Sequence, residues 1–150
     1  MKGDKAFVDT NVLLRAIHTS MPLHSEADLL ITTARQNDYE LWVSRQVIRE
    51  YIAQATRPGI LAHPLDAAQI RAKVNTIRAT FRVADETDAV TDKLLELIGE
   101  FSTGGKQVHD ANIVATMLVY NINTLLTQNV DDMKRFASKI TIRPLVAHEP

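Results

Sequence analysis

The sequence predicts an α/β fold in which a central, mostly parallel sheet of about four to five strands carries helices on both faces. Two observations support this prediction. Short apolar runs of strand length alternate with longer segments of helical periodicity along the whole chain. No internal repeat, low-complexity tract or linker divides the 150 residues, so we expect one domain over 1–150.

Apolar runs of three or four residues, next to turn or capping residues, predict the strands. The first run ends at Asp9, the second ends before Ser44, and the last precedes Pro144. The predicted strands lie at 6–8, 41–43, 81–83, 124–127 and 140–143.

Apolar residues spaced three and four positions apart predict the helices. Thr10 and Ser44 are the predicted N-caps of the first and third helices, and Pro64 suits the first turn of the fourth. The predicted helices cover about 11–18, 22–36, 45–56, 64–79, 90–98 and 108–120, with a short one through 133 and 136. The acids at 85, 86 and 88 precede the fifth helix and are interpreted as partners of its N-terminal dipole.

Composition excludes several classes of protein. The apolar fraction of 45% is that of a soluble globular chain, and no apolar run approaches the roughly 20 residues of a membrane span. The absence of cysteine excludes disulfides and thiolate metal sites, and the scattered histidines lack metal-ligand spacing. With no signal peptide in view, we expect a cytoplasmic protein. A net charge of −1 means that any contact with nucleic acid must use a local basic patch.

Acidic positions far apart in the sequence fall at one predicted edge of the sheet. Asp9 ends the first strand, and an Asn129-to-Asp132 group follows the fourth. Glu50 and Asp110 lie near helix beginnings, where Glu50 points away from its own helix's apolar stripe and Asp110 extends such a stripe. Strand C-termini and the following helix N-termini share an edge in parallel sheets. Capping by Asp9 and first-turn contacts of Asp110 with backbone N–H groups are the alternative roles.

Four acidic positions in one cleft would repel one another unless a cation neutralised them. Oxygen ligands without cysteine or clustered histidine suit Mg²⁺ or Mn²⁺. In enzymes such ions chiefly serve phosphate chemistry.

Four segments, in order, resemble the motifs of the PIN-domain nucleases. They are residues 7–14 (FVDTNVLL), Glu50 within 44–51, residues 109–115 (HDANIVA) and residues 125–132 (LLTQNVDD). Length and motif order are most similar to the VapC-like toxins of bacterial toxin–antitoxin pairs. The resemblance implies a PIN-like three-layer sandwich and a Mg²⁺- or Mn²⁺-dependent endoribonuclease that leaves 5′-phosphate and 3′-hydroxyl ends. It also implies a homodimer held inactive by a small antitoxin.

The expected catalytic set is Asp9, Glu50, Asp110 and Asp132. Asp9, Asp110 and Asp132 would hold the ion, while Glu50 would ligate it or orient a water molecule. Asn129, Asp131 and Asp132 all remain candidates for the last position, with Asp132 preferred. Thr10, Asn11 and Asn129 are expected to support the carboxylates or a bound water, although helix capping explains the first two equally well.

Three arginines near the predicted cleft edge, Arg15, Arg45 and Arg49, are expected to bind the RNA substrate, with Lys106 as a further candidate. Ordinary solvated charges are the alternative interpretation.

Two other functions are open. A non-catalytic PIN-like module could bind RNA or a protein, although filled acidic positions argue against a degenerate site. A phosphatase of the haloacid-dehalogenase type also begins with an Asp after a buried strand. Its second acid is missing here, because Asn11 stands in that position.

Overall fold

The computed structural model describes residues 3–145 and contains a five-stranded sheet in which every neighbouring pair of strands is parallel. The strand order is β3-β2-β1-β4-β5. The strands are β1 (Lys5–Val8), β2 (Glu40–Ser44), β3 (Arg82–Ala84), β4 (Thr124–Thr127) and β5 (Thr141–Pro144). The predicted parallel α/β fold is therefore confirmed.

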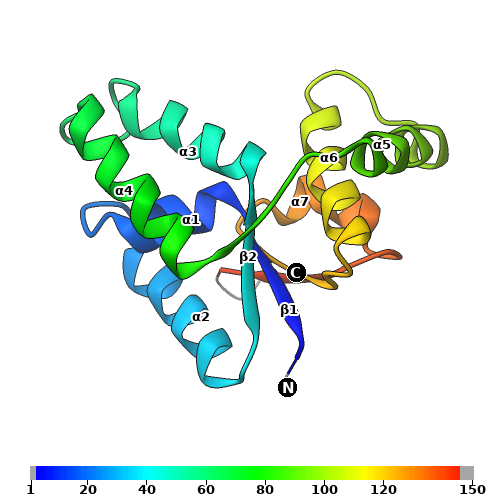
Figure 1. Cartoon of the computed structure of the whole chain (residues 1–150), viewed down its shortest axis with the longest axis horizontal. Coiled ribbons are helices and arrows are strands. Elements are labelled where there is room, and N and C mark those ends of the chain that lie inside the picture. The colour runs from blue at the N-terminus through cyan, green and yellow to red at the C-terminus, as the bar shows by residue number, and fades with distance from the viewer. Residues whose placement is uncertain (1–2, 146–150) are drawn as a thin grey trace.

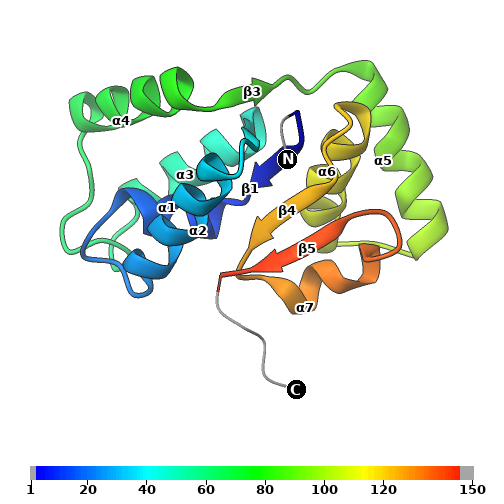
Figure 2. The same ribbon diagram turned by 90° about the horizontal axis from the view of Figure 1, so that it is seen from below.

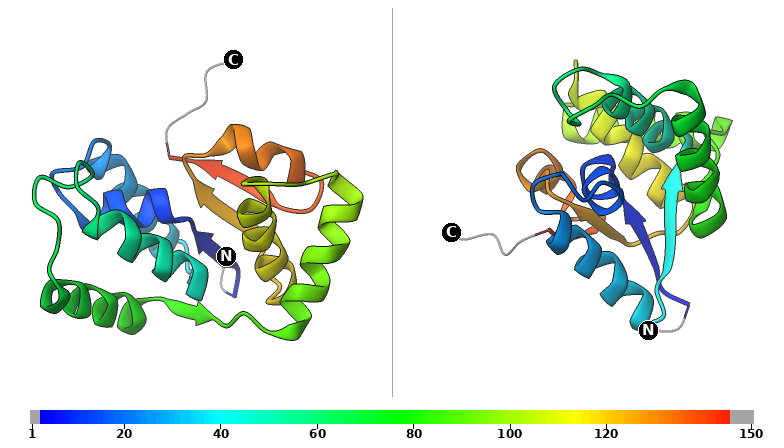
Figure 3. Two further views of the ribbon diagram at one scale, coloured as in Figure 1. Left: turned by 90° about the horizontal axis from the view of Figure 1, so that it is seen from above. Right: turned by 90° about the vertical axis from the view of Figure 1, so that its left-hand side faces the viewer.

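Helices cover the sheet in two groups (Figures 1 and 2). The first group is α1 (Thr10–Ile17), α2 (His24–Gln36), α3 (Arg45–Thr56) and α4 (Ala67–Thr80). The second is α5 (Asp88–Phe101), α6 (Gln107–Val119) and α7 (Val130–Met133), the last followed by a 3₁₀ turn over Lys134–Phe136. Figure 3 shows the two groups on opposite sides of the strands.

Topology explains this division. The chain builds the sheet in one direction from β1 to β3, and then crosses back to add β4 and β5 on the other side of β1. Because parallel crossovers are right-handed, reversing the direction moves the later helices to the opposite face. The order reverses between β1 and β4, and open α/β sheets bind ligands outside the carboxyl ends of strands at such a point.

The neighbouring strands β1 and β4 are the most buried strands of the sheet. Ala6, Phe7 and Val8 of β1 have no exposed surface, and every residue of β4 is buried. Side chains that leave the carboxyl ends of these strands are therefore rooted in a packed core. Within the described residues, no helix combines the length and apolar character that a membrane crossing requires.

Three predicted helix starts were wrong. Asp9, not Thr10, is the N-cap of α1, and its carboxylate accepts a hydrogen bond from the Thr10 backbone N–H. The second helix begins at His24, because Leu23 adopts a left-handed conformation with φ of 62° and breaks the helical path after Pro22.

The fourth helix begins three residues after Pro64. Asp66 is its N-cap and forms a capping box with Gln69, in which each side chain accepts a hydrogen bond from the backbone N–H of the other residue. The apolar ring of Pro64 offers no such acceptor.

Candidate active site

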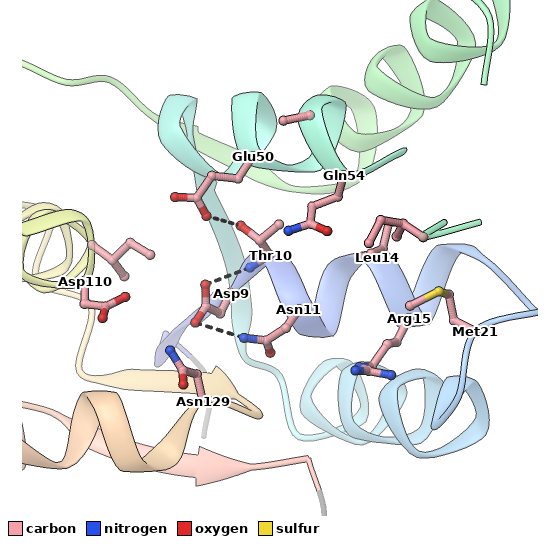
Figure 4. A pocket seen from close by; sticks show the side chains of 13 residues that line it. Asp9, Thr10, Asn11, Leu14, Arg15, Met21, Glu50, Gln54, Asp110 and Asn129 are labelled. Carbon is pink, nitrogen blue, oxygen red and sulfur yellow. Dashed lines mark hydrogen bonds between the residues drawn. The ribbon is translucent and has the colours of Figure 1, made fainter. Parts of the chain in front are cut away.

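A pocket of about 440 Å³ opens at the carboxyl ends of β1 and β4. Side chains from α1, α3, α6 and the segment after β4 line it, and its polar end holds Asp9, Glu50, Asp110 and Asn129 (Figure 4). The structure thus brings together three of the four expected catalytic carboxylates, although about 100 residues separate the first from the third.

Asp9 is almost fully enclosed, with 4% of its surface exposed. One carboxylate oxygen accepts from the Thr10 backbone N–H at 2.8 Å. The other accepts from the Thr127 hydroxyl at 2.8 Å and from the Asn11 amide at 3.4 Å. Burial raises the pKa of Asp9 to about 6, although the Thr127 and Thr10 hydrogen bonds act in the opposite direction. Three hydrogen bonds therefore fix the orientation of the carboxylate, while burial leaves its negative charge poorly solvated.

Glu50 points from α3 toward Asp9. The Thr10 hydroxyl donates to one Glu50 oxygen at 2.7 Å, and the Gln46 side-chain amide donates to the other at 2.8 Å. The predicted orientation away from the apolar stripe of α3 agrees with this arrangement. Because Asp9 rather than Thr10 caps α1, the Thr10 hydroxyl is free to hold Glu50.

Asp110 lies in the first turn of α6 and is partly buried. Burial raises the pKa of Asp110, and the negative charges of Asp132 and Glu50 raise it further. The nearby Arg135 and His109 side chains shift the pKa of Asp110 in the opposite direction.

The three candidates for the last catalytic position, Asn129, Asp131 and Asp132, differ in their location relative to the pocket. Asn129 lines the pocket. Asp132 is exposed and outside the pocket lining, but lies near enough to Asp110 for its charge to raise the Asp110 pKa. Asp131 is exposed and faces Lys134, with 3.6 Å between the charged atoms.

Asn11, in the first turn of α1, links this helix to the carboxyl end of β4. Its side-chain oxygen accepts from the Gln128 backbone N–H at 2.8 Å, and its amide nitrogen reaches the Thr127 hydroxyl at 3.4 Å. The Thr127 hydroxyl also accepts from the Asn129 backbone N–H at 2.9 Å. These bonds fix the segment after β4 against the start of α1.

Sequence reasoning missed Gln46, whose surface is 5% exposed. Its amide nitrogen donates both to Glu50 and, at 2.9 Å, to the backbone carbonyl of His109, the residue before Asp110. Its oxygen accepts from Asn112 at 2.7 Å. One amide thus links the helices that carry Glu50 and Asp110. The signal in the sequence was the spacing of Gln46 and Glu50, since residues four apart meet on a helix.

The predicted substrate-binding arginines divide into two kinds. Arg15 lines the pocket and donates to the Pro22 carbonyl at 2.6 Å. Arg45 and Arg49 are exposed outside the pocket lining, and each forms an ion pair, with Asp85 at 2.9 Å and with Glu86 at 3.1 Å. Lys106 is exposed just before α6.

The donor set fits a hard divalent cation that keeps part of its water shell. The polar end offers only carboxylate, amide and hydroxyl oxygens. In the part of the chain that the structure describes, no three His, Asp or Glu side chains are grouped so that they alone could hold an ion. Mg²⁺ is commonly bound through one or two carboxylates and several waters, so two of these acids suffice.

The sequence model of the PIN domain matches residues 6–139, which is most of the chain. The chain belongs to the PIN domain family. The expected family and PIN-like fold are therefore confirmed, and the acids described above lie at the carboxyl edge of a PIN domain. No curated protein sequence matches the chain significantly.

Solved structures with this PIN fold include VapC toxins. The chain resembles VapBC2 of Rickettsia felis bound to a promoter DNA fragment, with a TM-score of 0.69, 18% identity, and 93% of this chain and 98% of that chain covered. It resembles the sarcin–ricin loop cleaving toxin VapC20 of Mycobacterium tuberculosis, with a TM-score of 0.69, 19% identity, and coverage of 93% and 99%. For VapBC-1 of nontypeable Haemophilus influenzae, the TM-score is 0.69, the identity 15%, and the coverage 94% and 98%.

Proposed function

We propose that this PIN domain is a metal-dependent endoribonuclease. The observation that carries the proposal is the convergence of Asp9, Glu50 and Asp110, from three separate segments, in one pocket at the carboxyl edge of the sheet. Two of these carboxyl groups have raised pKa values because burial leaves their charge poorly solvated. A perturbed acidic cluster in a cleft is typical of a functional site.

Asp9 and Asp110 would hold Mg²⁺ or Mn²⁺, with Asp132 or Asn129 contributing directly or through water. A bound ion would supply water activation and would neutralise the scissile phosphate. Glu50 is fixed by Thr10 and Gln46, so it would orient the attacking water and take up its proton. Breakage of the phosphorus–O3′ bond then leaves 5′-phosphate and 3′-hydroxyl ends.

Arginine side chains would bind the RNA at two distances from the carboxylates. Arg15 lies in the pocket lining and would contact the nucleotide at the cleavage point. Arg45 and Arg49 would contact phosphates farther along the RNA, after giving up their ion pairs with Asp85 and Glu86. Exposed ion pairs of this kind contribute little stability, so exchanging them for phosphate contacts costs little.

We infer further that the protein acts in the cytoplasm as the toxin of a toxin–antitoxin pair, forms a homodimer, and is inhibited by a small antitoxin. Support comes from the likeness over nearly the full length of solved VapC chains, including the toxin of M. tuberculosis described as cleaving the sarcin–ricin loop. A small adjacent gene for a DNA-binding partner would add to that support.

The test compares wild-type protein with Asp110→Asn and with Asp92→Asn, a matched charge control at an exposed position of α5. Each is incubated with RNA in Mg²⁺, Mn²⁺ or EDTA, and the RNA ends are sequenced. We expect metal-dependent cleavage by wild type and Asp92→Asn and at least a hundredfold loss in folded Asp110→Asn. RNA binding without cleavage under any metal would favour the non-catalytic module. A phosphorylated Asp9 would favour the phosphatase.

A further inference from the structure

A chain of side-chain hydrogen bonds leads from Glu50 out of the pocket to the segment after β3. The Gln46 amide nitrogen donates to Glu50 at 2.8 Å, and the Gln46 oxygen accepts from the Asn112 amide nitrogen at 2.7 Å. The same Asn112 nitrogen donates to Glu86 at 3.4 Å. Asn112 and Glu86 are outside the pocket lining, so their influence on Glu50 passes through Gln46.

The groups at both ends of this chain accept hydrogen bonds and have no hydrogen to donate. At the inner end, the Gln46 nitrogen faces the Glu50 carboxylate and, at 2.9 Å, the backbone carbonyl of His109. At the outer end, the Asn112 nitrogen faces the Glu86 carboxylate. Both amides must therefore turn their nitrogens to these acceptors, and the Gln46 oxygen must face Asn112. The donor on Glu50 thus depends on a donor at Asn112.

Glu86 is held in place at the outer end. The Arg49 guanidinium donates to both Glu86 oxygens, at 3.1 and 3.2 Å. The preceding residue, Asp85, donates its backbone N–H to the Tyr120 hydroxyl at 2.9 Å, and that hydroxyl donates to the Asp85 carbonyl at 3.0 Å. Arg49 lies on α3, and Tyr120 is the C-cap of α6. The segment that leads from β3 to α5 (Figure 2) is therefore fastened to both helices.

The relative placement of Glu50 and Asp110 depends on contacts between their helices, because α3 and α6 belong to the groups on opposite sides of the sheet. Two of these contacts are made by one side chain, since Gln46 bonds both to the His109 carbonyl and to Asn112. A Gln46 amide turned the other way would direct its oxygen at the Glu50 carboxylate and the His109 carbonyl. Repulsion would then replace both hydrogen bonds.

We propose that Asn112 is a positioning residue for the reaction. It fixes the orientation of the Gln46 amide and so keeps a donor on Glu50, while Glu86 anchors Asn112 from outside the pocket. Without a donor at Asn112, the Gln46 amide would turn over and Glu50 would lose its orientation toward the attacking water. This inference rests on the proposed nuclease function, in which Glu50 acts on that water.

The first test is Asn112→Asp, which keeps the shape of the side chain and replaces its amide donor by an oxygen that only accepts. The Gln46 amide should turn to donate to the new carboxylate. We expect kcat to fall at least about tenfold and KM to change less than about threefold, since Asn112 lies outside the pocket. Asn75→Asp, the same change at an exposed position of α4, should keep the wild-type kcat. A wild-type kcat in folded Asn112→Asp would overturn the proposal.

The second test separates the amide from the added negative charge. Asn112→Asp is introduced into Gln46→Leu protein, where no amide remains to turn. We expect a further loss in kcat of less than about threefold, because both changes remove the same support of Glu50. A purely electrostatic effect of the new charge would lower kcat equally in both backgrounds, and equal losses would overturn the proposal.

NMR tests the orientation of Gln46 without RNA or metal. The side-chain amide signals of Gln46, assigned by their loss in Gln46→Leu, are recorded with and without Glu50→Gln. In the wild-type background Glu50→Gln should shift these signals, and in the Asn112→Asp background the shift should be much smaller. Equal shifts in both backgrounds would overturn the inference. The expected pattern in a protein that cuts no RNA would uphold the positioning of Glu50 and refute only the nuclease proposal.

Discussion

The enclosed carboxyl group of Asp9 should destabilise the metal-free protein at neutral pH. With 4% of its surface exposed, Asp9 has a pKa raised from 3.8 to about 6. The folded state therefore binds the Asp9 proton more tightly than the unfolded state does. The resulting stabilisation is fully present below about pH 4 and is lost as pH rises through about 6. At 1.36 kcal/mol per pKa unit, the loss amounts to about 3 kcal/mol at pH 7.5.

The variant Asp9→Asn removes this ionisation and keeps an oxygen for the Thr10 backbone N–H. Urea unfolding of wild type and variant is measured in EDTA from pH 4 to pH 8, with Asp92→Asn as the exposed control. The NH2 group of the variant replaces the oxygen that accepts from Thr127 and Asn11, so the informative quantity is the change with pH. We expect the stability of Asp9→Asn relative to wild type to rise by up to about 3 kcal/mol between pH 4 and pH 7.5. The control should show no such trend. A stability difference between variant and wild type that stays constant from pH 4 to pH 8 would refute this account of burial.

Three further outcomes follow from the site. Mn²⁺ at about 100 times its Kd should stabilise wild type by roughly 2.7 kcal/mol and leave Asp9→Asn nearly unchanged in urea unfolding; equal gains in both would contradict an ion at Asp9. Gln46→Leu should lower kcat about tenfold or more, because Glu50 loses a donor, and folded variant with wild-type kcat would oppose the positioning role. Thr127→Val should move the Asp9 pKa above 6 in carboxyl NMR titrations, since one stabilising donor is removed, and a lower value would contradict it.

The sequence was sufficient for the fold and for the convergence of acids, because both follow from general rules of parallel sheets. Alternating strand and helix patterns imply right-handed crossovers, and those place strand ends and helix starts at one edge. Asp9, Glu50 and Asp110 could therefore be expected in a common pocket without knowledge of any side-chain contact.

Hydrogen bonds and ion pairs between residues that lie far apart in the chain could not be predicted from the sequence. Gln46 bonds to α6 through His109 and Asn112, about 60 residues away, so its position on α3 alone did not reveal its partners. Asp85 and Glu86 were interpreted as partners of the α5 dipole, yet they form ion pairs with the two arginines of α3. The choice between Asn129 and Asp132 likewise depends on how the short α7 turns after β4.

Crystals grown with Mn²⁺ and measured at a wavelength where manganese scatters anomalously test the central claim most directly. The account predicts one strong anomalous peak between the carboxylates of Asp9 and Asp110, within direct or one-water reach of both. A manganese peak elsewhere on the molecule, with none in this pocket at saturating Mn²⁺, would contradict it.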